Sequence, residues 1–65
     1  MFYKMDFMKK YGDDEFQYRT YIVRDFDMST NENGDIYYSI EFGNGEKTVI
    51  AKNQFDRVSI VVLPV

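Results

Sequence analysis

Side chains with oxygen ligands alternate in the stretch DMSTNENGD, which contains Asp27, Ser29, Asn31, Asn33 and Gly34. Alternating oxygen ligands before a glycine are typical of a calcium loop of the EF-hand type. Counted from Ser29, however, the first position lacks a carboxylate, and the twelfth is Ile40, where such a loop needs a bidentate Glu. We therefore expect no metal site here and interpret the stretch as a hairpin turn.

Catalytic chemistry has few candidate residues in this chain. It contains no His and no Cys, so the commonest general base and the commonest thiol nucleophile are both missing. Asp25 and Asp27 are a possible carboxylate pair, but we interpret them as solvent-exposed charges at a strand edge. Gly43-Asn44-Gly45 lacks the Lys and the following helix of a phosphate-binding loop. We expect neither enzymatic activity nor a bound cofactor.

Composition predicts a small acidic protein. The chain has 65 residues, enough for one domain with one core, and twelve aromatic side chains (six Tyr and six Phe) to fill it. Eleven Asp and Glu oppose eight Lys and Arg, which gives a formal charge of −3 and argues against nucleic-acid binding. Without cysteines or an apolar leader sequence, we expect a cytoplasmic location.

Turn sequences divide the chain into extended segments. They are Gly12-Asp13-Asp14, Asn33-Gly34-Asp35 and Gly43-Asn44-Gly45. Segments 16–22 and 35–42 alternate with a period of two, which indicates strands with one buried face, and segments 46–52 and 58–63 are strands by composition. A single 3₁₀ turn is expected over 53–56, with Phe55 pointing inward. Segment 2–9 is a strand or a short helix, and its alternation favours the strand.

A candidate binding surface follows from the alternation. If Ile36, Tyr38, Ile40 and Phe42 point into the core, their neighbours point outward. An exposed Tyr surrounded by carboxylates suits a basic protein partner, because the ring supplies contact area and the charges steer the encounter. The residues predicted to bind this partner are Tyr21, Asp25, Asp27, Asp35, Tyr37, Glu41 and Glu46.

The last predicted strand provides a second candidate surface. Val58, Ile60 and Val62 can fill the core, which leaves Val61 and Leu63 on the other face of an edge strand. If nothing covers them, strand pairing would produce a homodimer with Val61 and Leu63 as its interface.

The predicted order of elements resembles that of a known fold class. A strand, a long bent strand, two tight hairpins, a 3₁₀ turn and a closing strand resemble an SH3-like barrel, and the segment GDIYYSIEFGNGEKTVIAKNQFDRV resembles the Tudor-like variety. This resemblance covers about residues 34 to 63 and implies a five-stranded antiparallel barrel. It also implies a cage for methylated Lys or Arg, at Tyr37 or Tyr38, Phe42, and Tyr18 or Tyr21. The alternation, however, predicts that Tyr38 and Phe42 point into the core.

From the sequence we expect an all-β domain over 1–65 that acts as a non-enzymatic protein-binding module. One specific hypothesis is a phage or mobile-element inhibitor, whose acidic face occupies the basic groove of a host or defence enzyme that handles nucleic acid. One alternative is a self-assembling component associated through residues 58–63. The other is a nucleic-acid-binding barrel that uses Lys9, Lys10, Arg19 and Arg24.

Overall fold

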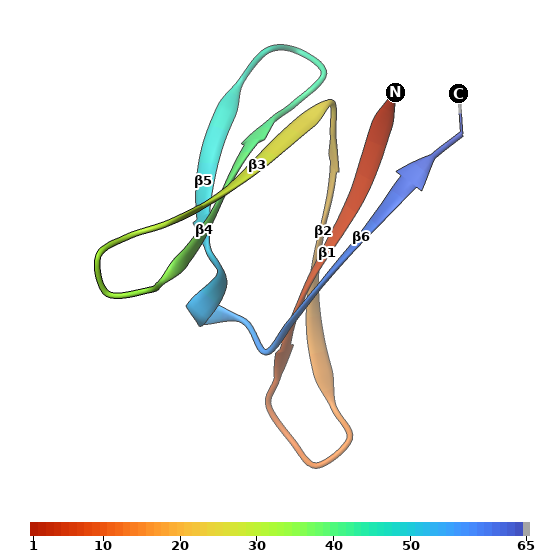
Figure 1. The fold of residues 1–65 in the computed structure, drawn as a ribbon. Coiled ribbons are helices and arrows are strands. Elements are labelled where there is room, and N and C mark those ends of the chain that lie inside the picture. Colours follow the sequence, from red (N-terminus) through yellow and green to blue (C-terminus); the bar gives the residue numbers. More distant parts are fainter. Residues whose placement is uncertain (65) are drawn as a thin grey trace.

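A computed structural model describes residues 1–64 of the chain. The fold of these residues is all-β. Among these residues, six strands and one 3₁₀ turn follow one another along the chain (Figure 1). They are β1 (Phe2–Lys10), β2 (Phe16–Val23), β3 (Asp25–Thr30), β4 (Ile36–Glu41), β5 (Lys47–Ala51), η1 (Lys52–Gln54) and β6 (Arg57–Leu63). No helix within this part of the chain has the length and apolar character needed to cross a membrane.

The strands form two antiparallel sheets of three, with orders β2-β1-β6 and β3-β4-β5. The expected five-stranded barrel is therefore wrong in two respects: residues 1–64 form six strands, and the sheets do not close. The long bent strand is divided at Arg24, whose backbone N–H donates to the Glu41 carbonyl at 2.8 Å. Before β6 begins, the backbone N–H of Asp56 already donates to the carbonyl of Met8 in β1, at 2.9 Å, and β6 then pairs with β1 and not with β5.

The core lies between the two sheets. Its buried side chains come from β1, β2 and β4, and they are Met5, Phe7, Val23, Tyr38 and Ile40. Segment 2–9 is thus part of a strand, as its alternation favoured, and the inward face predicted for β4 is confirmed. A single 3₁₀ turn does form, but over Lys52–Gln54 and not over 53–56; Phe55 follows it and points inward as predicted, with its ring centroid 5.2 Å from that of Phe7.

The inward face of β2 differs from the prediction, which placed Tyr21 outward. Tyr21 is partly buried and its ring lies 5.8 Å from Phe7, whereas Ile22 is 49% exposed. The registers Met5↔Tyr21 and Tyr3↔Val23 place the odd-numbered residues of β2 on the core face. On β3, however, Phe26 packs against the core, so the inward positions are even-numbered. The alternation shifts by one residue at Arg24, where the chain passes from one sheet to the other.

Two turns predicted from glycines form the hairpins of the second sheet. Gly34 and Gly45 have φ angles of 82° and 89°, a region that L side chains rarely occupy. In the first hairpin, the Asn31 side-chain oxygen accepts the backbone N–H groups of Asn33 and Asp35, at 2.9 and 3.0 Å. The Asn31 oxygen, which lies in the stretch compared above with a calcium loop, therefore stabilises the hairpin turn.

The last strand contributes less to the core than expected. Val58 packs against the core, but Ile60 and Val62 are 37% and 54% exposed, so the prediction that all three are core residues is wrong for these two. Val58, Ser59 and Leu63 of β6 are partly buried, whereas the three residues between Ser59 and Leu63 are exposed.

Candidate partner-binding face

Four residues predicted to bind a partner share the outer face of the β3-β4-β5 sheet. In the register, Asp25 is opposite Glu41 and Asp27 is opposite Ser39. Because Tyr38 and Ile40 point into the core, Tyr37, Ser39 and Glu41 point outward between them. We call this surface the acidic face, and it comprises Asp25, Asp27, Tyr37, Ser39, Glu41, Lys47 and Val49.

An open hollow of about 320 Å³ lies on the acidic face. Residues 25–27 of β3, 39–41 of β4 and 47–49 of β5 line it. Val49 is 62% exposed and supplies apolar surface there, while Asp25 and Asp27 supply carboxylates at the β3 side. The hollow therefore combines apolar contact area with negative charge.

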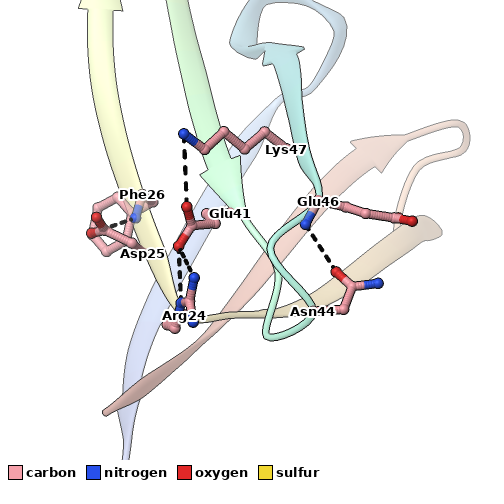
Figure 2. A network of polar contacts seen from close by, with 7 residues as sticks. All are labelled: Arg24, Asp25, Phe26, Glu41, Asn44, Glu46 and Lys47. Carbon is pink, nitrogen blue, oxygen red and sulfur yellow. Dashed lines mark hydrogen bonds and ion pairs between the residues drawn. The ribbon is translucent and has the colours of Figure 1, made fainter.

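Glu41 is held in place by two basic residues (Figure 2). The Arg24 guanidinium donates from Nε and Nη2 to Glu41 Oε2, at 2.9 and 2.5 Å. Lys47 Nζ lies 3.8 Å from Oε1 of the same carboxylate. The hydrogen bond from Arg24 lowers the pKa of Glu41 below its ordinary value, and the positive charges of Arg24 and Lys47 add to this effect against desolvation. Glu41 is thus an ion-paired anchor between β4 and β5.

Asp25 and Asp27 are the carboxylates available to a partner. Each accepts a hydrogen bond from the next backbone N–H, at 2.9 Å from Phe26 and 3.0 Å from Met28. Within residues 1–64, neither takes part in an ion pair. An incoming cation could therefore pair with them without displacing an existing charge partner.

Four of the predicted residues do not line the hollow: Tyr37, which lies elsewhere on the acidic face, and three others. Asp35 belongs to the β3–β4 turn and accepts a hydrogen bond from Asn31 Nδ2 at 3.1 Å. The Glu46 side chain points away from Glu41 (Figure 2). Tyr21, on β2 of the other sheet, has its ring centroid 6.1 Å from that of Phe42, and it lines a second hollow together with Tyr37 and Val49.

The rings implied by the Tudor-like resemblance do not all meet in one cage, although Tyr21 and Tyr37 line the same hollow. Tyr38 is a core residue at 7% exposure, and Tyr18 is 59% exposed on the outer side of β2. Tyr37 lies on the acidic face, where its hydroxyl accepts a 3.4 Å hydrogen bond from Asn31 Nδ2. Tyr21 and Phe42 pack on the core margin.

The basic residues proposed for nucleic acid are also distributed. Lys9 and Arg19 line one hollow beside η1, together with Gln17, Gln54 and Phe55. Lys10 follows on the opposite face of β1, and Arg24 is ion-paired with Glu41. The four side chains do not form one cluster.

Sequence reasoning missed Arg24 and Lys47 as partners of Glu41. The position of Lys47 had a usable signal, because a hairpin centred on Asn44 places Glu41 directly opposite Lys47. Arg24 had none, since its contact with Glu41 depends on the shift between the two sheets.

Comparison with protein families, with curated proteins and with solved structures found no match.

Proposed function

We propose that this chain is a non-enzymatic protein-binding module that docks a basic segment of a partner protein on its acidic face. The observation that carries this proposal is the hollow of about 320 Å³, which places the exposed Val49 beside the unpaired carboxylates Asp25 and Asp27. An Arg or Lys side chain fits such a surface, because its aliphatic stem packs on apolar area while its charged end pairs with carboxylates.

The network around Glu41 supports this use of the surface. Arg24 and Lys47 fix the central carboxylate, so the middle of the face is already ordered before a partner arrives. A preordered surface loses less side-chain entropy on binding. The missing His and Cys favour binding over catalysis, because the usual general base and thiol nucleophile are absent from the chain.

The element order supports an open SH3-like arrangement as the finer description of the fold. A long strand bent at Arg24, two glycine hairpins and a 3₁₀ turn before the last strand occur here in the order of that fold class. The resemblance to SH3-like domains is therefore part of what we propose.

The partner that we propose is a cytoplasmic enzyme that handles nucleic acid, with the chain as its phage or mobile-element inhibitor. Such enzymes have basic grooves that bind phosphates, and the carboxylates of Asp25 and Asp27 are complementary to them in charge. Bound nucleic acid would then compete with the chain for the same groove.

The proposal is tested by neutralising the two unpaired carboxylates. The tagged wild-type chain is used to capture a partner from nuclease-treated lysate, and the Asp25→Asn/Asp27→Asn variant is compared with it. Loss of two exposed ion pairs, each worth about 0.2–1 kcal/mol, should weaken binding about twofold to thirtyfold, and salt should weaken the wild-type complex more than the variant complex.

Asp13→Asn/Asp14→Asn is the matched control, because it removes the same charge from the turn between β1 and β2. This variant should bind as the wild type does. If both variants bound the partner equally weakly, net charge alone would explain the effect. If the Asp25→Asn/Asp27→Asn variant bound as tightly as the wild type, the acidic face would not be the interface.

A further inference from the structure

Four strands leave one edge without a strand partner in residues 1–64. They are β2 and β6 at the edges of one sheet, and β3 and β5 at the edges of the other. Figure 1 shows β6 beside β1, with no strand on its other side. Unpaired edges are templates for pairing with another chain unless charge, Pro or a bulge protects them.

Among these four edge strands, β6 has the longest run without a charged residue. β3 carries Asp25 and Asp27, β5 begins with Lys47, and β2 contains Arg19. In β6 the single charged residue is Arg57 at the first position, and residues 58–63 are uncharged up to Pro64. The edge with the longest uncharged run also contains four β-branched residues, which are Val58, Ile60, Val61 and Val62.

Both faces of β6 are exposed as well as its edge. Ile60, Val61 and Val62 are consecutive, and their exposed fractions are 37%, 48% and 54%. Successive residues of a strand point to opposite faces, so neither sheet face covers this part of the strand. An exposed apolar surface of this kind, continuous around one strand, is typical of an association site.

We propose that β6 pairs antiparallel with β6 of a second copy, which joins two β2-β1-β6 sheets into one continuous six-stranded sheet. This surface is separate from the acidic face and the proposal does not depend on the proposed function. A twofold axis at Val61 would place the two Val61 residues opposite each other and Ile60 opposite Val62 of the other copy. Pairing in this register keeps the exposed apolar residues together and juxtaposes no charges.

The surface area of the chain favours a second copy as the occupant. Its accessible surface is 4904 Å², whereas a compact monomer of 7.8 kDa has about 4,400 Å². This excess of about 500 Å² is spread over the whole chain, and the exposed Ile60, Val61 and Val62 contribute to it; a stable interface buries roughly 800 Å² on each partner. Because a strand without internal charge is complementary to itself, a second copy supplies a suitable surface without any other partner.

The test measures the molar mass of the purified chain by sedimentation equilibrium over a wide concentration range. The wild type should form dimers, and Val61→Lys should raise the dissociation constant at least tenfold, because it places two like charges opposite each other. Ile22→Lys is the matched control, since Ile22 is 49% exposed on β2, at the far edge of the same sheet, and it should dimerise as the wild type does. Circular dichroism checks that both variants are folded.

A disulfide test reports the register directly. The chain has no Cys, so a Val61→Cys variant has one thiol, and directly opposed residues of an antiparallel pair lie within the Cα separation of a disulfide. Mild oxidation joins the two thiols with loss of two electrons and two protons to the oxidant. Val61→Cys should form a covalent dimer much faster than Ile22→Cys. A wild type that stays monomeric, equal dissociation by both Lys variants, or equal cross-linking of both Cys variants would overturn the proposal.

Discussion

The face of β2 that points into the core can be tested by two neighbouring truncations, Val23→Ala and Ile22→Ala. Ile loses three carbon atoms and Val loses two, so composition alone predicts that the Ile22 variant is the less stable. Burial reverses this order, because Val23 is 0% exposed and Ile22 is 49% exposed. The two variants therefore report which side chain the core contains.

The expected free energies follow from the burial. Removing two fully buried carbon atoms costs about 1.6 kcal/mol of transfer free energy, and an unfilled cavity adds about 1 kcal/mol, so Val23→Ala should lower the free energy of unfolding by about 2.5 kcal/mol. Three half-exposed carbon atoms are worth about 1.2 kcal/mol, and their removal leaves no cavity. A 65-residue domain has only about 3–5 kcal/mol of stability, so Val23→Ala should remove about half of it or more.

Urea unfolding followed by far-ultraviolet circular dichroism measures both values, at one protein concentration so that any association is equal. The midpoint of Val23→Ala should be clearly below that of Ile22→Ala, with similar slopes. The opposite order would show that Ile22 faces the core and would refute the shift in alternation at Arg24.

Three further predictions concern single contacts. Gly34→Ala should lower the free energy of unfolding by about 1 kcal/mol in urea, because its φ of 82° disfavours a side chain although the space is open, and Gly34→Asn should cost less; equal losses would contradict the backbone explanation. Phe55→Leu should cost about 1 kcal/mol and speed amide exchange at residue 55, since the ring packs on Phe7; unchanged exchange would mean that the ring does not anchor η1. Glu41→Gln should lower the urea midpoint at pH 7, and this difference should disappear in acid. The lowered pKa of Glu41 means that its stabilising effect is present above about pH 4.5 and is lost as the pH falls through the folded value; a difference that persists in strong acid would assign the effect to packing.

The sequence predicted local features better than those that depend on distant pairing. Gly34 and Gly45 determine their own turns, so the two hairpins of the second sheet and the inward positions of β4 followed from nearby residues. The 3₁₀ turn before Phe55 was predictable for the same reason.

The faces of β2 were not predictable, because both sets of alternating positions contain large apolar residues. Tyr18 and Ile22 are on one face, and Tyr21 and Val23 are on the other. The pairing of Tyr21 with Met5 decides between them, and that contact joins separate strands. Assuming one continuous alternation from residue 16 to residue 30 placed Tyr21 with Asp25 and Asp27, whereas the shift at Arg24 separates them.

The pairing of β1 with β6 has a consequence for the order of folding. It brings Phe2 beside Leu63, about sixty positions away along the chain, whereas the hairpins of the second sheet close loops of only a few residues. Loop closure over a long segment costs more chain entropy, so non-local strand pairs form slowly. A two-stranded β1–β2 hairpin is only marginally stable by itself, so the first sheet becomes stable only when β6 has paired with β1. The edge of β6, with its run of exposed apolar residues, is then the last to pair. During refolding at high concentration it would stay unpaired long enough to associate non-natively with another chain.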